Sequence, residues 1–509
     1  MKTSKTNFFL IILAFLVLPA FSQVEPVDLE VIYKIKQEGL KNSKIKELSF
    51  YMTDFVGPRL PNSSNGRHAQ EVAMEKMKEF GLTNVHTEVW GEFGKGWDNE
   101  KTYIAMTEPY YSVMIGTPKA WTSGTKGLVK SEVVLVDIQD EEDFEKYKGK
   151  LKDKVIITPS MREYETSFEP MAHRYTDEEL EELTKFSTQG RRRGNFTEAD
   201  MARWRKMRSM RGKISSFLIE EGCAGVLSTS GFFGTPRGSG ASAKAEKPAI
   251  TEITLTGEHH GRIIRLMQHD VPVMIEMDIQ NKWLTEDLND YNVIGEIPGT
   301  DKKLQEEVVM VGGHLDSWHM GTGANDNASG CIVMMEAMRI LKAIGVQPKR
   351  TLRIALWGSE EQGLNGSKNY VKDHFGSAKD PKADYAKLSA YYNIDNGSGK
   401  VRGIYLQEND MLKPIFEAWL APFENMDANT VTLKNTGGTD HLVFNSAGLN
   451  GFQFIQDRID YSRGYHTNMD TYERLMMDDM KQTAIIVAAI VYHTAMRDEL
   501  LPRKPIMKK

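Results

Sequence analysis

The stretch "EVVMVGGHLDSWHMGTGANDNASGCIVMMEAMRILKAIG", residues 307–345, contains the features that decide the fold. It opens with an apolar run typical of a strand that is covered on both faces. A glycine-rich loop follows, which carries two histidines and two aspartates, and the stretch ends in an apolar helical pattern. A buried strand that leads through a polar loop into a helix indicates a layered α/β domain. The sites of such domains lie outside the carboxyl ends of their strands.

The same alternation continues toward the C-terminus. Near-continuous apolar runs recur in "TLRIALWGSE" (351–360), "SAYYNID" (389–395) and "GFQFIQD" (451–457), and "KQTAIIVAAIVYHTAM" (481–496) predicts a buried helix. We therefore expect residues 286–509 to form the main part of an α/β domain, with residues 23–114 as its N-terminal part.

Residues 115–285 have a different character and predict a separate, smaller, β-rich unit. Short β-type runs such as "KVIITPS" (154–160) and "PVMIEMDI" (272–279) are separated by glycine and charged residues. The arginines 191–193 resemble a nucleic-acid patch, but Met201, Trp204 and Met207 fall at helical spacing beyond them. We interpret the stretch 190–213 as a basic, solvated helix with one apolar stripe, and we expect His259 and His260 on the surface.

The first residues predict export. Lys2 and Lys5 precede an apolar run from Phe8 to Leu18 and a small-residue cleavage signal, which is typical of a signal peptide over residues 1–22 that is cut near Ser22. The run is too short to span a membrane. We expect a secreted or periplasmic protein without a membrane anchor.

The remaining composition excludes few function classes. A net charge of −6 gives no indication of a nucleic-acid partner. The two cysteines, Cys223 and Cys331, lie far apart and lack metal-knuckle spacing, so we expect two buried free thiols.

Ligand-type side chains follow each predicted strand of the main domain. In chain order they are His314, Asp316, Asp326, Glu360, Glu361, Asp395 and His466. Imidazole nitrogen together with carboxylate oxygen suits zinc, and such a set holds two ions if one carboxylate bridges. Asp316 could accept the second N–H of the His314 ring and fix its tautomer. The alternative is a polar surface loop rich in turn formers.

Six motifs resemble one family. They are "GGHLDS", "GANDNASG", "GSEEQGLNGS", "NIDNG", "GGTDHLVF" and "YHTNMDT". This ordered set is similar to the co-catalytic zinc exopeptidases, the group of aminopeptidases and glutamate carboxypeptidases, and most of all to their carboxypeptidase Q-like members. The resemblance implies a three-layer α/β/α domain with a mixed, mostly parallel sheet. It also implies an inserted protease-associated domain at 115–285, and a homodimer is compatible with it.

The resemblance also implies residue roles. One zinc would be held by His314, Asp326 and Asp395, and a second by Asp326, Glu361 and His466, with Asp326 as the bridge. Glu360 would be the general base and Asp316 would support the ligands. His441 is a candidate donor to the developing oxyanion or to substrate, and a structural Asp440–His441 pair is the alternative. His319 is expected at the rim of the site, and Asp470 is expected to shape a loop.

The implied function is a zinc-dependent exopeptidase that acts on small peptides or dipeptides with a free N-terminus. Three alternatives stay open: a glutaminyl cyclase-like enzyme with one zinc, a receptor-like binding protein with a silent site, and a structural role of the inserted domain in gating or in pairing subunits. The third is compatible with an enzyme. Arg458 and Arg463, close to His466, are weak candidates for binding a substrate carboxylate.

Overall fold

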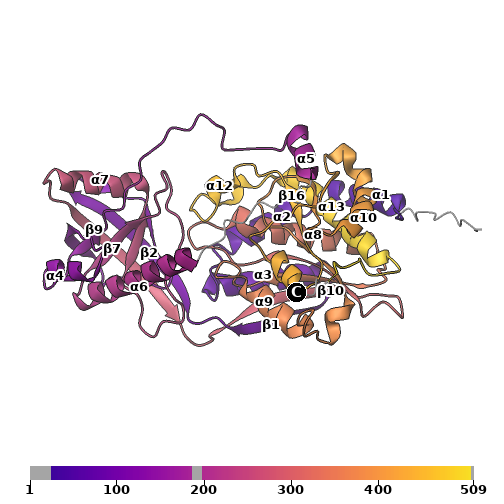
Figure 1. The fold of residues 1–509 in the computed structure, drawn as a ribbon, viewed down its shortest axis with the longest axis horizontal. Coiled ribbons are helices and arrows are strands. Elements are labelled where there is room, and N and C mark those ends of the chain that lie inside the picture. The colour runs from indigo at the N-terminus through magenta and orange to yellow at the C-terminus, as the bar shows by residue number, and fades with distance from the viewer. Residues whose placement is uncertain (1–24, 186–197, 506–509) are drawn as a thin grey trace, which may run out of the picture.

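The computed structural model describes residues 25–185 and 198–505, which form two units side by side (Figure 1). Each unit contains an eight-stranded sheet. The expected signal peptide and the arginines 191–193 lie outside the described residues. In the described part of the chain, every helix is too short or too polar to cross a bilayer.

The first sheet has a parallel centre. Its strand order is β1 (Thr83–Glu92), β10 (Asn289–Ile297), β12 (Thr351–Trp357), β11 (Val308–His314), β13 (Leu388–Asn393), β16 (Gly451–Gln456), β14 (Val401–Tyr405) and β15 (Thr430–Thr432). The four strands β12, β11, β13 and β16 run parallel, whereas β1, β10 and β14 pair antiparallel with their neighbours β10, β12 and β16. Every residue of β11, β13 and β16 is buried, as their apolar runs predicted.

Helices cover both faces of this sheet. One apolar core joins the sheet to α1 (Leu29–Lys41), α2 (Ile45–Phe50), α3 (Ser64–Glu79), α8 (Ser329–Ala343), α10 (Lys413–Leu420) and α13 (Met477–Met496). A second core joins the other face to α9 (Asn365–Tyr370) and α11 (His441–Ser446). This mixed, layered α/β arrangement agrees with the sequence prediction.

The second sheet is inserted between β1 and β10 in the chain. Its order is β3 (Ser112–Val113), β2 (Gly96–Glu108), β9 (Met274–Leu284), β5 (Val129–Leu135), β6 (Val155–Ile157), β7 (Gly225–Thr229), β8 (Glu252–Leu255) and β4 (Gly116–Pro118). The unit also contains α4 (Phe144–Tyr147), α6 (Glu198–Glu220) and α7 (Gly257–Gln268). The second sheet begins at Gly96 rather than at residue 115, because β2 pairs along its length with β9.

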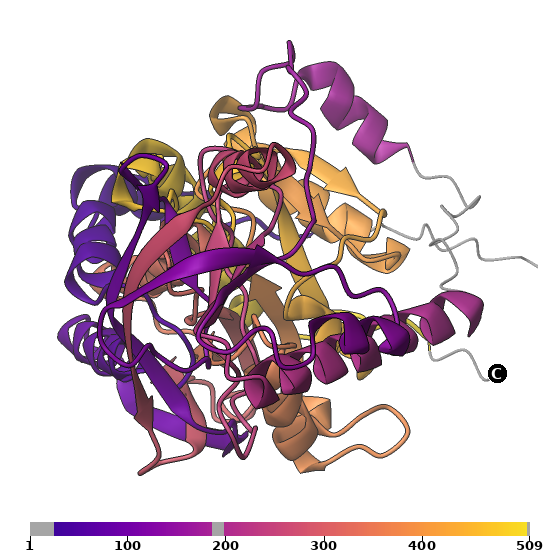
Figure 2. The same ribbon diagram turned by 90° about the vertical axis from the view of Figure 1, so that its left-hand side faces the viewer.

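One segment of the second unit returns to the first. The chain after β6 crosses to α5 (Asp177–Thr184), which packs against β15 and lies apart from α6 in both views (Figure 1, Figure 2). Arg174 anchors this segment through ion pairs of 2.9 Å to Asp457 and 2.8 Å to Asp479. The charged stretch expected inside the insertion is therefore divided between the two units.

Several side chains differ from expectation in the second unit. Met201 of α6 is exposed, the side chains of Trp204 and Met207 lie outside the described part, and Ile214 and Leu218 pack farther along the helix. His260 is fully buried rather than on the surface, because α7 turns it inward with Ile263 and Ile264. Both cysteines are free, as expected, but only Cys331 is buried, whereas Cys223 is half-buried.

Candidate metal centre

The predicted ligand residues meet at the carboxyl edge of the parallel strands. His314 is the last residue of β11, Glu360 and Glu361 follow β12, and Asp395 follows β13. These three strands are neighbours in the sheet, so their ends bring the side chains together. The convergence follows from the topology that the apolar runs predicted.

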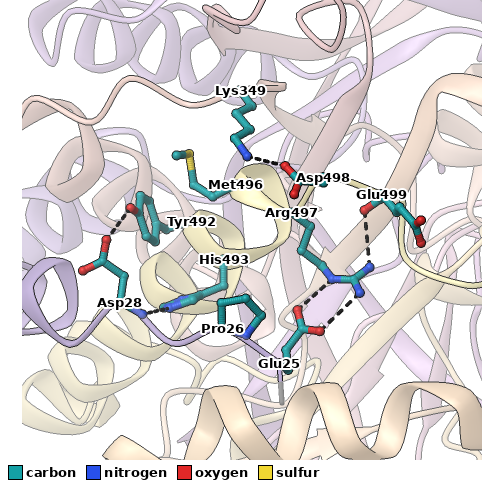
Figure 3. A pocket seen from close by; sticks show the side chains of 10 residues that line it. All are labelled: Glu25, Pro26, Asp28, Lys349, Tyr492, His493, Met496, Arg497, Asp498 and Glu499. Carbon is teal, nitrogen blue, oxygen red and sulfur yellow. Dashed lines mark hydrogen bonds and ion pairs between the residues drawn. The ribbon is translucent and has the colours of Figure 1, made fainter. Parts of the chain in front are cut away.

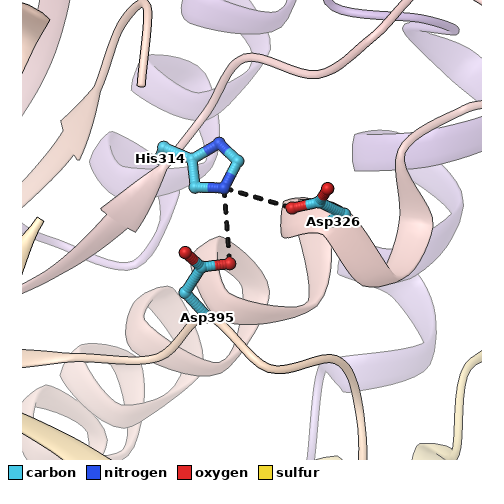
Figure 4. Close-up of side chains that lie close together, drawn as sticks. All are labelled: His314, Asp326 and Asp395. Atoms are coloured by element: carbon cyan, nitrogen blue, oxygen red, sulfur yellow. Dashed lines mark ion pairs between the residues drawn. The ribbon is translucent and has the colours of Figure 1, made fainter. Parts of the chain in front are cut away.

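The first cluster consists of His314, Asp326 and Asp395 (Figure 4). The Nε2 atom of His314 lies 3.3 Å from Oδ1 of Asp326 and 3.4 Å from Oδ1 of Asp395. All three side chains are less than a tenth exposed. The geometry offers one nitrogen and two carboxylate oxygens around a single point.

The second cluster shares Asp326 with the first and adds Glu361 and His466. The Nε2 atom of His466 lies 3.0 Å from Oδ2 of Asp326 and 2.8 Å from Oε2 of Glu361. The two oxygens of Asp326 therefore face different histidines, Oδ1 toward His314 and Oδ2 toward His466. In each cluster the ligand atoms lie within 4.8 Å of one another.

The donor set fits cations. Four ligand atoms have no hydrogen-bond partner although they are buried: Oδ2 of Asp326, Oε1 of Glu361, Oδ1 of Asp395 and Nε2 of His466. Buried polar atoms without a partner are costly, so such atoms commonly face an ion or water. Nitrogen and carboxylate oxygen are the ligands that zinc prefers in catalytic sites.

Asp470 and Arg59 shape the loop that carries Asp326. The two carboxylate oxygens of Asp470 accept hydrogen bonds from the backbone N–H groups of Asn325 (2.7 Å) and Asp326 (3.0 Å). The buried Arg59 guanidinium donates to the carbonyls of Leu315 (2.6 Å) and Gly323 (2.8 Å). Asp470 was expected to shape a loop, whereas Arg59 was missed, because nothing in its "GPRLP" surroundings indicates contact with a strand far along the chain.

Asp316 contacts its neighbours in a different way from the one expected. Its main-chain carbonyl, not its carboxylate, lies 3.0 Å from Nδ1 of His314, and its carboxylate is 3.6 Å from that nitrogen. The carboxylate instead accepts from the backbone N–H groups of Glu360 (3.0 Å) and Glu361 (3.2 Å). Asp316 thus holds the backbone of both glutamates in place.

Burial dominates the electrostatics of the glutamates. It raises the pKa of Glu360 to about 10, with Asp395 and Asp440 adding repulsion and His314 opposing the rise. Burial and the Asp326 charge raise the pKa of Glu361 to about 8. Burial lowers the pKa of His466, but the close carboxylates of Asp326 and Glu361 outweigh it and raise that pKa to about 9. Without a counter-ion, the site therefore keeps protons that it would release to a divalent cation.

The pocket beside the two clusters is small and acidic. Its volume is about 200 Å³, and it is lined by Asp326, Glu360, Glu361, Asp395, Asn396, Gly437, Gly438, Thr439, Tyr461, Tyr465 and His466. A larger hollow of about 530 Å³ lies near the start of β12 (Figure 3). Its charged groups pair with one another, Arg497 with Glu25 at 2.7 Å and Lys349 with Asp498 at 2.6 Å, so size alone does not mark the site.

Four sequence candidates are absent from the lining of the acidic pocket. His441 is fully buried, and its Nε2 faces the Thr436 carbonyl at 3.3 Å rather than the pocket. Arg463 pairs with Asp460, and Arg458 is exposed. His319 lies between the two units, where Nε2 contacts the Pro118 carbonyl at 2.8 Å.

Comparisons with known proteins agree with this geometry. Residues 292–491 match the model of peptidase family M28. Carboxypeptidase Q of Mus musculus is 27% identical over 460 residues, which cover 89% of this chain and 86% of that protein. A peptidase M28 precursor from Shewanella amazonensis has a similar fold, with a TM-score of 0.65, 22% identity and coverage of 94% of this chain and 99% of that one.

A zinc aminopeptidase from Bacillus subtilis also shares the fold, with a TM-score of 0.57, 18% identity and coverage of 90% and 96% of the two chains. The family match falls on the segment that supplies all five ligand-type side chains of the two clusters. Residues 292–491, which carry these side chains, thus match peptidase family M28, and the chain is a zinc-dependent metallopeptidase.

Proposed function

We propose that this protein is an exported exopeptidase with two zinc ions, which hydrolyses dipeptides or other small peptides that have a free N-terminus. The observation that carries the proposal is the position of Asp326 between two ligand clusters, with one carboxylate oxygen turned to each. His314 and Asp395 would complete one zinc site, and Glu361 and His466 the other. Export rests on the N-terminal sequence alone, which lies outside the described residues.

In this proposal Glu360 is the general base. It lines the pocket next to Asp395 and Glu361 but belongs to neither ligand cluster, so its carboxylate is available to take a proton from water. Zinc in such a site polarises a substrate carbonyl and makes water more acidic. Glu360 would then pass the proton to the leaving amine. The Asp316 carboxylate fixes the backbone of Glu360 and so keeps its side chain at the pocket.

The character of the pocket favours a substrate with a free amine. Four carboxylates line it, from Asp326, Glu360, Glu361 and Asp395, and none of the described lining residues is Lys or Arg. A substrate ammonium group is attracted to such a surface, whereas a substrate carboxylate is repelled. We further propose that the inserted unit is a protease-associated domain, which contacts the loop around His466.

Two measurements test the proposal. Elemental analysis should give two zinc ions per chain, and one ion would favour the glutaminyl cyclase-like alternative. Hydrolysis of one dipeptide should be compared in free, N-acetylated and C-amidated forms. We expect acetylation to abolish turnover and amidation to be tolerated better; equal turnover of the acetylated form would refute recognition of the amine, and no turnover of any form would favour the receptor-like alternative.

A further inference from the structure

Trp318 connects the metal centre to the second unit. Its indole Nε1–H donates a hydrogen bond of 2.9 Å to Oε2 of Glu361, the same oxygen that lies 2.8 Å from Nε2 of His466. The Trp318 and His466 rings also meet edge to face, with centroids 6.0 Å apart. One indole therefore contacts both outer residues of the second cluster.

The opposite side of Trp318 packs against the inserted unit. The centroids of the Trp318 and Trp121 rings lie 6.3 Å apart. A Cβ atom added at Gly238 would stand 3.0 Å from both Cβ and Cγ of Trp318, which is tighter than most real contacts. The absence of a side chain at Gly238 thus permits this close approach.

The same glycine also reaches His466. The backbone N–H of Gly238 donates to the His466 carbonyl at 2.8 Å. Its neighbour Arg237 stacks its guanidinium 4.7 Å from the centre of the Tyr465 ring, and Tyr465 in turn stacks on His466 at 3.6 Å. The inserted unit therefore supports both Glu361 and His466.

The first cluster is held differently. His314 faces the Asp316 carbonyl, and the Asp326 backbone is bound by Asp470, so both supports come from the first unit. Through Trp318 and Gly238, the inserted unit supports Glu361 and His466, the two residues that belong only to the second cluster. This asymmetry distinguishes the two clusters physically.

We propose that Trp318 is a positioning residue for the second zinc site, through which the inserted unit controls the affinity of that site and not of the first. Its N–H fixes the rotation of the Glu361 carboxylate by binding Oε2, the oxygen that lies against His466, and leaves Oε1 without a hydrogen-bond partner. Partners that orient a metal ligand in this way typically change metal affinity 10–100-fold. The inference rests on the proposed pair of zinc ions.

The test compares two tryptophan variants of the full protein. Trp318→Phe removes the N–H and keeps an aromatic ring. Trp121→Phe is the matched control, because it alters the same packing, but the Trp121 N–H has no hydrogen-bond partner to lose. Zinc is removed, and both binding steps are then titrated against a chelator of known affinity, with the melting temperature of the zinc-free protein as the measure of folding.

We expect Trp318→Phe to bind the first zinc as the wild type does and the second about 10–100-fold more weakly. We expect Trp121→Phe to bind both normally. Unchanged binding of the second zinc, or equal loss at both sites, would overturn the inference. If Trp318→Phe lowers the melting temperature of the zinc-free protein, Gly238→Ala replaces it as the test, because the added Cβ displaces the Trp318 ring from the second unit. Gly238→Ala should weaken binding of the second zinc only. Wild-type affinities of Gly238→Ala for both zinc ions would also overturn the inference.

The outcomes separate this inference from the proposed function. A wild-type protein that binds one zinc contradicts the pair of ions itself. A wild-type protein that binds two, together with a Trp318→Phe variant that binds two equally well, contradicts only the role of Trp318.

Discussion

Replacing Glu360 by glutamine tests the proposed general base directly. The amide has almost the size of the carboxylate, and the backbone N–H of residue 360 keeps its hydrogen bond to Asp316. Because Glu360 belongs to neither ligand cluster, Glu360→Gln should leave the zinc content unchanged. The substitution removes the capacity to accept a proton and little else.

The expected loss of activity follows from the rate enhancement that a general base contributes. A positioned base contributes about 10²–10⁴-fold, so kcat should fall by that factor while KM changes little. A factor of ten corresponds to about 1.4 kcal/mol, which makes the loss about 3–5 kcal/mol of transition-state stabilisation.

The stability of the zinc-free variant gives an independent reading. Burial raises the pKa of Glu360 to about 10, so the folded zinc-free protein holds this carboxyl neutral at pH 7 and the neutral amide removes no charge. The melting temperatures of the two zinc-free proteins should agree within about 2 °C near pH 5, and at pH 7 the variant should melt higher, because only the wild type must keep a proton that its unfolded chain releases. A carboxyl whose pKa is raised on folding loses stability as the pH rises from about 5 to 10, so the variant should lose less than the wild type over that range.

Dipeptide turnover, elemental analysis and thermal unfolding decide between the outcomes, with Glu424→Gln as a control at an exposed glutamate. Turnover within tenfold of the wild type at full zinc content would remove Glu360 from the role of base. Loss of zinc from Glu360→Gln would make this residue a ligand instead.

The remaining predictions concern the metal, a buried histidine and the substrate. Chelation of zinc should abolish activity, and re-addition should restore it. The zinc-free protein should also melt at lower temperature as the pH rises from 5 to 8, because burial raises the pKa of Glu361 to about 8. A melting temperature that does not change with pH would contradict this. Burial lowers the pKa of His260 to about 4, so the folded state resists a proton that the unfolded chain accepts below about pH 6.5. The wild type should therefore lose about 2 kcal/mol more than His260→Phe between pH 7.5 and 5 in urea unfolding, and parallel profiles would contradict the linkage. Arg237 stacks on Tyr465 but is absent from the pocket lining, so Arg237→Ala should change KM equally for a free dipeptide and for its C-amide. A larger change for the free dipeptide would indicate a contact with the substrate carboxylate.

The convergence of the ligand-type side chains could be predicted from the sequence, because it depends on local sequence patterns. Apolar runs marked the parallel strands, and the polar residues directly after each run had to reach one edge of the sheet. His314, Glu361 and Asp395 all come to that edge in this way. The orientation of Asp316 was less accessible, because a carboxylate and a carbonyl of one residue compete for the same ring nitrogen.

The contacts between the units had no comparable signal. Trp318 and Gly238 lie 80 residues apart, and no periodicity relates them. The pairing of β2 with β9 is equally non-local, which is why the insertion begins at Gly96 rather than where the composition shifts. His260, by contrast, was predictable: it stands three and four residues before Ile263 and Ile264, the spacing of one helix face.

The buried carboxylates of the site need a positive counter-charge if they are to be ionised together. Burial raises the pKa of Asp440 and of Asp470 to about 7, and it also raises the pKa of Glu360 and of Glu361. Without a cation, the folded protein must therefore keep protons on carboxyl groups that the unfolded chain ionises at neutral pH. The buried cation Arg59 directs its N–H groups at backbone carbonyls rather than at these carboxylates. Divalent ions would supply the missing charge at the atoms that lack partners. The residues proposed for catalysis thus impose a cost on the metal-free fold, and binding of zinc should contribute to stability as well as to chemistry.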